Sequence, residues 1–221
     1  NLNLLAQAQT TITVDPEVAP LRTFYLSPDG NDSWDGTSST FQGGTKGPWK
    51  TANFALEYLS SGLSPGDTLK ILDGTYVISK NSKCCTPPDS RGGPSIGENQ
   101  LGAPDKWITI EAADGAHPVF DEFEARIIMK GTFIKIRGLE FRNYPSIAAI
   151  MPSSFNLIED NKFSNFYEAI RTGAYSAGLV VRNNEFWMNR PTAYTYGSIR
   201  GDGLLFENNV HYWTADTKSG I

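Results

Sequence analysis

The chain of 221 residues is poor in the residue types that most often build zinc and redox sites, with two histidines and two cysteines. The cysteines are adjacent, Cys84-Cys85. Neighbouring cysteines lack zinc-ligand spacing, and a disulfide between them would be strained. We interpret them as two thiols or a vicinal bridge in a surface loop, so cysteine usage does not reveal the redox compartment.

Other signatures are missing as well. No run of about 18 apolar residues occurs, so no segment is predicted to cross a membrane as a helix. The net charge of −5 argues against non-specific nucleic-acid binding, which needs a basic surface. We find no P-loop, dinucleotide fingerprint, metal-binding histidine pair or catalytic triad. The function therefore has to be sought in other patterns.

The dominant pattern is an internal repeat between residues 133 and 213. Four six-residue segments align without gaps: 136–141, 158–163, 181–186 and 206–211. Successive segments are offset by 22, 23 and 25 residues. A period in this range predicts a stacked repeat, in which each coil buries its apolar face on the next.

Two columns of the aligned segments predict how the coils pack. The sixth position holds the rings of Phe141, Phe163, Phe186 and His211. The fourth position holds Leu139, Asn161, Asn184 and Asn209. We expect the rings to stack in the core, His211 included, and the asparagines to form an internal ladder at a turn. A short amide there satisfies backbone groups and tolerates left-handed backbone angles.

Charge alternates between neighbouring coils in the remaining columns. The second position reads Arg137, Glu159, Arg182, Glu207, and the fifth reads Glu140, Lys162, Glu185, Val210. Opposite charges are favourable when coils stack at strand spacing, about 4.8 Å. The repeat therefore predicts an all-β solenoid of parallel strands, with most of these charges paired to one another.

Upstream of the repeat we expect an extended arm over 1–22 and a cap over 23–66, with coils over 67–221. The cap contains a predicted helix at 50–60, because residues 52, 55, 56 and 59 are apolar on one helical face. A long polar insert is expected over 79–106. The chain ends a few residues after a coil, and we expect no C-terminal cap.

Short motifs in the first half resemble a known superfamily. These are Phe24-Tyr-Leu-Ser-Pro-Asp-Gly-Asn-Asp-Ser, Gly47-Pro-Trp-Lys-Thr, Ser64-Pro-Gly-Asp-Thr-Leu, Leu72-Asp-Gly-Thr-Tyr, Trp107-Ile-Thr-Ile-Glu-Ala and Pro118-Val-Phe-Asp. They are similar to the N-terminal half of pectate-lyase-like proteins, especially secreted polysaccharide lyases. The resemblance covers about residues 23–213. It implies a right-handed parallel β-helix and extracellular polysaccharide binding or β-elimination, often with calcium.

A lyase of acidic polysaccharide needs a cation for the carboxylate and a base for the neighbouring proton. Our candidates for the catalytic residues are Arg171 and Arg200, in 168–172 and 197–201, which we expect to be the same strand in adjacent coils. Both arginines would then point outward without an acid in their column. The alternative is that each pairs with a loop carboxylate such as Asp202 or Glu168. Lys135 is a weaker candidate, as are the repeat residues Lys162 and Arg182.

Aromatic side chains crowd the same region and are candidate sugar-stacking platforms. The substrate-binding candidates are Tyr167, Trp187, Tyr194, Tyr196, Tyr212 and Trp213, with Tyr175 nearby. The alternative is that most of these rings cover the coil edges as packing. We find no acidic cluster with calcium-ligand spacing on the strands, so calcium follows from the resemblance alone and no metal ligands are proposed.

Loop 28–37 carries the spacing Asp29, Asn31, Ser33 and Asp35, which superficially resembles a calcium loop. The twelfth position is Thr40 where such a loop has a bidentate glutamate. We therefore favour Asx turns as the role of these side chains.

Two functions remain open from the sequence. One is a secreted, polysaccharide-associated β-helix, either a lyase or a binder. The other is a non-catalytic extracellular filament or surface subunit that stacks end to end through open coils and the N-terminal arm. Residues 4–8 are similar to the tail of a signal peptide, which agrees with an extracellular location. Expected partners are a polysaccharide or further copies of the chain.

Overall fold

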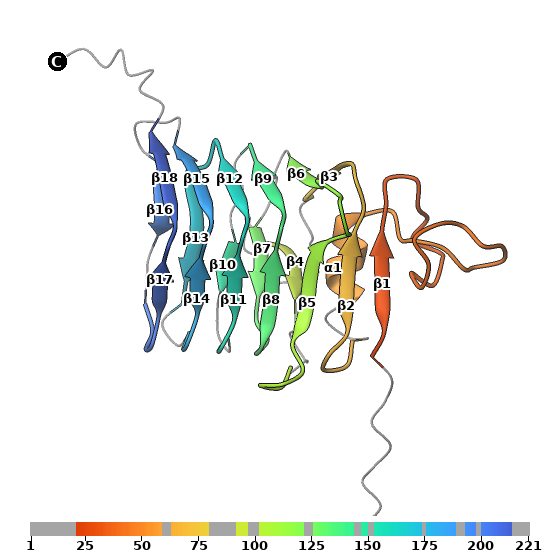
Figure 1. Cartoon of the computed structure of the whole chain (residues 1–221), viewed down its shortest axis with the longest axis horizontal. Coiled ribbons are helices and arrows are strands. Elements are labelled where there is room, and N and C mark those ends of the chain that lie inside the picture. Colours follow the sequence, from red (N-terminus) through yellow and green to blue (C-terminus); the bar gives the residue numbers. More distant parts are fainter. Residues whose placement is uncertain are drawn as a thin grey trace, which may run out of the picture.

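The computed structural model describes residues 21–58, 63–79, 92–96, 102–121, 126–143, 147–149, 153–173, 176–188, 193–197 and 200–213. Within these residues three sheets run side by side along one axis (Figure 1). No helix in the described part is long and apolar enough to cross a membrane. The predicted N-terminal arm, Cys84-Cys85 and Tyr175 lie outside the described residues.

The strands fall into three parallel sheets. The seven-stranded sheet is, in order, β1 (Thr23–Leu26), β2 (Thr68–Ile71), β5 (Ile108–Ala112), β8 (Ile134–Arg137), β11 (Leu157–Glu159), β14 (Val180–Arg182) and β17 (Leu205–Glu207). The six-stranded sheet is β3 (Thr75–Val77), β6 (Val119–Asp121), β9 (Glu140–Arg142), β12 (Lys162–Ser164), β15 (Glu185–Met188) and β18 (Val210–Trp213). The five-stranded sheet is β4 (Gly92–Ile96), β7 (Arg126–Met129), β10 (Ile147–Ala149), β13 (Glu168–Thr172) and β16 (Tyr194–Gly197).

Each coil visits the sheets in the same sequence. From β8 in the seven-stranded sheet the chain passes to β9 in the six-stranded sheet and β10 in the five-stranded sheet, and then returns to β11 beside β8. Crossovers between parallel strands are right-handed in nearly all proteins. The architecture is a right-handed parallel β-helix, which confirms the predicted fold.

An aromatic stack fills the core behind the six-stranded sheet. Neighbouring ring centroids lie 5.0–5.5 Å apart along the whole series. The series is Tyr76, Phe120, Phe141, Phe163, Phe186 and His211. The predicted column is confirmed and begins two coils earlier than the aligned segments. Since Phe120 to Phe186 are almost fully buried, this stack is a large part of the apolar area that the fold removes from water.

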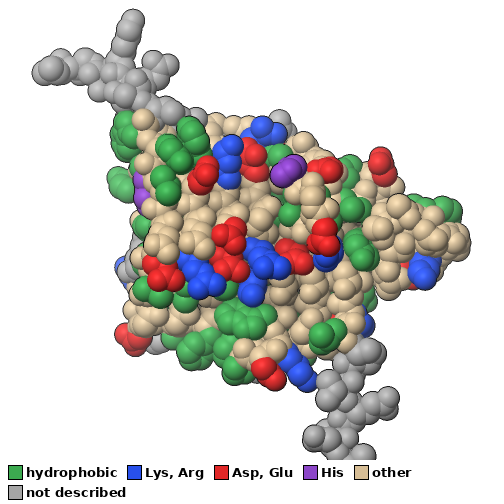
Figure 2. Space-filling model, viewed as in Figure 1, with side chains coloured by type: hydrophobic (Ala, Val, Ile, Leu, Met, Phe, Trp, Pro, Cys, Tyr) green, Lys and Arg blue, Asp and Glu red, His purple; other side chains and the backbone are tan. Residues whose placement is uncertain are grey.

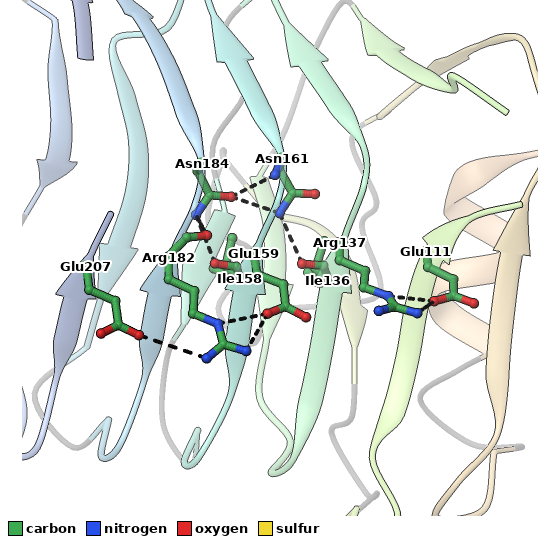
Figure 3. A network of polar contacts seen from close by, with 9 residues as sticks. All are labelled: Glu111, Ile136, Arg137, Ile158, Glu159, Asn161, Arg182, Asn184 and Glu207. Carbon is green, nitrogen blue, oxygen red and sulfur yellow. Dashed lines mark hydrogen bonds and ion pairs between the residues drawn. The ribbon is translucent and has the colours of Figure 1, made fainter. Parts of the chain in front are cut away.

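The asparagine ladder is also confirmed, at the turn between the seven-stranded and six-stranded sheets (Figure 3). Asn184 Oδ1 accepts from the backbone N–H of Asn161 at 2.9 Å, and Asn184 Nδ2 donates to the carbonyl of Ile158 at 2.9 Å. Asn161 makes the equivalent bonds to Leu139 and Ile136 one coil earlier. Each asparagine thereby pairs buried backbone groups that the turn would otherwise leave without partners.

The left-handed backbone falls one residue before the ladder and not on it. Positive φ angles of 52–70° occur at Gly138, Asp160, Asn183 and Asn208. Glycine, asparagine and aspartate are the residues that adopt this conformation at least cost. At each turn the first of two adjacent residues therefore adopts the left-handed backbone, and the second provides the side-chain amide that binds backbone groups.

The charge column of the seven-stranded sheet is longer than the repeat indicated (Figure 3). Its residues are Lys70, Glu111, Arg137, Glu159, Arg182 and Glu207, in register across six strands. Arg137 contacts Glu111 at 2.6 Å and Arg182 contacts Glu159 at 2.7 Å. These hydrogen bonds raise the pKa of both guanidinium groups. Most of the charges are mutual partners, as predicted.

The N-terminal end is closed by helix α1 (Ala52–Tyr58) and the segment before it. Ala52, Ala55 and Leu56 are buried. Trp49 stacks on Phe24 with centroids 5.1 Å apart and forms a parallel bridge to Leu26, which covers the outer edge of β1. The predicted capping helix is therefore present, and it sits next to β4, where a coil would place a strand of the five-stranded sheet.

The expected insert over 79–106 is wrong in one respect. Strand β4 lies inside it and pairs with β7 in parallel, so the interval contributes a coil to the helix. Its sequence, Gly-Gly-Pro-Ser-Ile, has low strand propensity and one large apolar residue. The strand forms because its neighbour β7 supplies a buried edge, which no local pattern reveals.

Candidate functional site

The five-stranded sheet carries a compact cluster of charge on its outer face. Arg126 Nη2 lies 2.8 Å from Glu168 Oε2, and Arg171 Nη1 lies 3.6 Å from the same oxygen. Ile127 and Ile170, the strand neighbours of the two arginines, are buried on the opposite side in the core. Two guanidinium groups thus share one carboxylate.

Partial burial strengthens the electrostatic interactions within this cluster. The side chains of Arg126 and Glu168 are 17% and 12% exposed, so their interaction is only weakly screened by solvent. Arg171 is more open, at 34%. Glu168 is the one carboxylate that the described residues place within ion-pair distance of Arg171. The guanidinium of Arg171 therefore presents N–H donors to an incoming anion.

Arg200 lies near this cluster but not in the predicted register. Strand β13 pairs with β16 so that Arg171 faces Gly197, and 168–171 is in register with 194–197, which rules out the expected pairing of 168–172 with 197–201. Arg200 follows that strand, and its backbone N–H and carbonyl are both bound to the Thr172 hydroxyl, at 2.7 and 2.8 Å. The expected column of two arginines was wrong because the repeated Ile-Arg pair suggested an offset three residues too long.

Two exposed tyrosines border the cluster. Tyr194 is in register with Glu168 and projects beside it, and the rings of Tyr167 and Tyr194 meet edge to face at 5.8 Å. Both side chains are more than half exposed. Arg171 lies four residues beyond Tyr167 along extended chain, about 13 Å. The outer face of the five-stranded sheet therefore offers a cation and a pair of rings within reach of one oligomeric ligand.

The remaining aromatic candidates lie on a different face. Trp187 and Tyr212 are neighbours in the six-stranded sheet and stack with centroids 4.1 Å apart. Lys162 Nζ lies 5.7 Å from the Trp187 ring. Trp213, at the end of β18, is about half exposed. These rings form a second aromatic strip, which the structure does not bring together with Arg171.

Tyr196 packs against the core, and His211 stacks at the end of the ring column, on the exposed last strand. The Tyr196 ring contacts Phe186, Phe206 and His211, and its hydroxyl is buried without a hydrogen-bond partner in the described part of the chain. Burial raises the pKa of Tyr196 to about 12. His211 stacks on Phe186 at 5.1 Å, and burial lowers its pKa. Tyr196 is thus a packing residue and not an exposed platform. His211 stacks on Phe186 as predicted, but the prediction that it lies in the core was wrong, because it sits on β18, where all four residues are exposed.

The weaker basic candidates are engaged elsewhere. Lys162 lies 3.9 Å from Glu140, in the expected column. Arg182 binds Glu159, as described above. Lys135 differs: its ammonium lies 5.5 Å from the Trp107 ring, and no described carboxylate pairs with it.

The described residues contain no group of three or more histidine, cysteine, aspartate or glutamate side chains placed to hold a metal ion. In loop 28–37, Asn31 Oδ1 accepts from Ser33, and Asp35 Oδ1 accepts from Thr37, both at 2.9 Å to the backbone nitrogen. These are Asx turns, the interpretation we favoured over a calcium loop. Calcium therefore stays an expectation from the resemblance, with no described residues assigned to it.

The face formed by the seven-stranded sheet carries separate bands of charged and apolar side chains (Figure 2). Acidic and basic side chains alternate in a stripe across the seven-stranded sheet, and apolar side chains gather below it, over the start of the strands. Three aromatic residues precede strands of this sheet, and their role was not predicted from the sequence: Trp107 before β5, Phe133 before β8 and Phe155 before β11. Phe133 and Phe155 occupy equivalent places in adjacent coils and share a left-handed backbone, but two residues are too few to stand out as a repeat.

Comparison with known proteins supports the fold. Neither a family model nor a curated protein matches the sequence. A structure described as rhamnogalacturonan lyase superposes with a TM-score of 0.58 at 19% identity, over 86% of this chain and 51% of that chain. Pectate lyase Pel9A superposes with a TM-score of 0.54 at 16% identity, over 93% and 58%. The chain spans little more than half the length of these structures, and identity this low shows a shared fold alone.

Proposed function

We propose that this chain is an extracellular, polysaccharide-associated β-helix that binds an acidic polysaccharide along the outer face of its five-stranded sheet. The observation that carries the proposal is the cluster in which Arg126 and Arg171 share Glu168 beside the exposed rings of Tyr167 and Tyr194. A uronate polymer complements this face, because its carboxylates can pair with the guanidinium of Arg171 and its sugar rings can pack on the tyrosines. The two structures with the same fold are lyases named for rhamnogalacturonan and pectate, which supports the ligand class.

In this proposal Arg171 recognises a carboxylate as a cation. Its planar guanidinium matches a carboxylate with two parallel hydrogen bonds. An arginine guanidinium stays protonated in proteins, so Arg171 acts as a fixed cation. A base in β-elimination must instead accept a proton. The geometry therefore favours binding and charge neutralisation by Arg171 over proton abstraction.

The tyrosines supply the second element of recognition. Sugar rings present C–H faces that pack on aromatic rings, and the phenol hydroxyls remain free to reach solvent or the sugar. Because Tyr167 and Tyr194 are perpendicular to each other, they form a corner against which one ring of the polymer can lie. Arg200, next to Thr172, is placed to add a second positive charge where the polymer leaves the sheet.

The test is binding to polygalacturonate, measured by calorimetry at low and high salt. Arg171→Gln is expected to weaken binding about tenfold, because a charged hydrogen bond contributes roughly 1.5–3 kcal/mol. Arg182→Gln is a matched control: it removes an arginine of similar exposure that also pairs with a glutamate, but from the seven-stranded sheet. Equal affinities for the two variants would contradict the proposed site.

Lyase activity is the further possibility within this proposal. It is tested in the same samples by following the absorbance of the unsaturated uronate product, with polygalacturonate, rhamnogalacturonan and alginate, with and without added calcium. Binding without product supports a binding module. Product that disappears in Arg171→Gln and persists in Arg182→Gln supports a lyase with the predicted catalytic arginine.

A further inference from the structure

A small aromatic ledge lies just before strands β5, β8 and β11 of the seven-stranded sheet. Phe133 and Phe155 stack with centroids 5.3 Å apart and planes within 13°. Trp107 meets Phe133 edge to face at 5.5 Å, and its indole N–H is held by the Pro104 carbonyl at 3.0 Å. Phe155 is 52% exposed, which is unusual for a ring that belongs to an ordered stack. The three rings, here called the Trp107 ledge, belong to the seven-stranded sheet, on the same face as the charge column, whereas Arg171 lies in the five-stranded sheet.

The backbone beneath the ledge is strained. Phe133 and Phe155 have φ angles of 52° and 53°, in the left-handed region that bulky side chains rarely adopt. The equivalent turn positions in the next two coils are Gly178 and Gly203, also left-handed, at 59° and 63°. Glycine adopts these angles without cost, and phenylalanine does not. The coils of β8 and β11 therefore have phenylalanine at turn positions where the following coils have glycine.

Glycines also shape the space around the rings. A Cβ at Gly102 would lie 2.8 Å from Phe133 Cβ, and one at Gly178 would lie 2.7 Å from Phe155 Cδ1. The Phe155 ring thus extends across the backbone of the following coil because no side chain stands there. Beyond it, a Cβ at Gly203 would meet nothing closer than 3.7 Å, so the stack has room to continue.

One cation accompanies the rings. Lys135 Nζ lies 5.5 Å from the Trp107 ring, and its strand neighbours in register are Thr109 and Leu157, which carry no charge. Since no described carboxylate pairs with Lys135, its ammonium is available to an anion. Rigid rings beside a single amine complement a ligand with apolar ring faces and an occasional carboxylate.

We infer that the Trp107 ledge is a second carbohydrate-binding subsite, which stacks a pyranose ring of an acidic polysaccharide on Phe155 and pairs its carboxylate with Lys135. The inference takes its ligand class from the proposed function but uses different residues on a different sheet. A polymer held at both places would cross from one face to the other, and the second contact would raise the effective concentration of the first.

The test is affinity electrophoresis of the folded full chain in gels containing polygalacturonate, with dextran gels as the neutral reference. Phe155→Asn removes the ring and keeps a residue that tolerates the left-handed backbone. Phe41→Asn is the matched control, because Phe41 is 56% exposed and also stacks on another ring, Trp34. We expect Phe155→Asn to be retarded about fivefold more weakly than the wild-type chain, and Phe41→Asn to be retarded as strongly as the wild-type chain.

A second variant, Lys135→Gln, leaves the rings in place and guards against a folding defect in Phe155→Asn. It is expected to weaken retardation by polygalacturonate to a similar extent. If wild type is retarded and both ledge variants behave like Phe41→Asn, the ledge is refuted while the proposed function stands. If the ledge variants lose retardation and Arg171→Gln does not, the ledge stands and the five-stranded site falls. A wild-type chain that polygalacturonate does not retard overturns both.

Discussion

Asn184 is the position where the account of the fold can be tested most sharply. Its side chain is fully buried and makes bonds in both directions along the ladder. Oδ1 accepts from the backbone N–H of Asn161, and Nδ2 donates to the Ile158 and Arg182 carbonyls, all at 2.9 Å. Asn184→Ala would leave at least the Asn161 N–H and the Ile158 carbonyl buried and unpaired.

The magnitude follows from these two groups. An unsatisfied buried polar group costs about 1–3 kcal/mol, so the substitution should lower the free energy of unfolding by about 3 kcal/mol. With a urea slope of roughly 2 kcal/mol per molar, the midpoint moves down by about 1.5 M. The fluorescence of Trp187 and Trp213 reports directly on the coils that follow the substitution.

Asn183→Gly provides the control in the same turn. Asn183 is exposed and supplies the left-handed angle, 55°, which glycine also adopts. We expect it to change the free energy of unfolding by less than about 0.5 kcal/mol. If Asn184→Ala proves as mild as Asn183→Gly, the ladder contributes no stability and the reasoning is refuted.

Three further predictions follow from the core. Phe163→Ala, in the middle of the ring stack, should cost about 4 kcal/mol in urea unfolding, and a loss below about 1 kcal/mol would contradict close packing there. Tyr196→Phe removes a buried hydroxyl without a described partner and should be neutral or stabilise the fold by about 1 kcal/mol, whereas a clear loss of stability would reveal a missed hydrogen bond. The pKa of His211 should lie below 6.5 in an NMR titration, because burial favours the neutral ring. Its contribution is then complete above about pH 6.5 and declines as the pH falls toward the folded-state pKa, a dependence that His211→Phe should abolish.

The repeat could be recognised in the sequence because each coil packs against its neighbours in the same way. A ring at 141, 163 and 186 must meet the same neighbours, so the column appears in the sequence. The same holds for Asn161 and Asn184, whose amides bind equivalent backbone groups. Columns with one chemistry per position are therefore the part of a β-helix that sequence reasoning recovers.

The candidate site was harder, because it depends on differences between coils. Arg171 was identified correctly as an outward cation, and Glu168 was among its anticipated partners. Its neighbour Arg126 was missed, since the register of the five-stranded sheet shifts through loops of unequal length and cannot be counted from 126 to 168. The same shift misplaced Arg200. Tyr196 looked like its exposed neighbour Tyr194 but turns inward and packs on the rings of Phe186, Phe206 and His211.

We propose that acidic polysaccharide binds at the outer face of the five-stranded sheet. The most direct test is the ratio of polygalacturonate affinities of Arg171→Gln and Arg182→Gln, measured side by side in the same buffer. The account predicts that Arg171→Gln binds about tenfold more weakly than Arg182→Gln, which should match wild type. A ratio near one, with wild type binding, would contradict it.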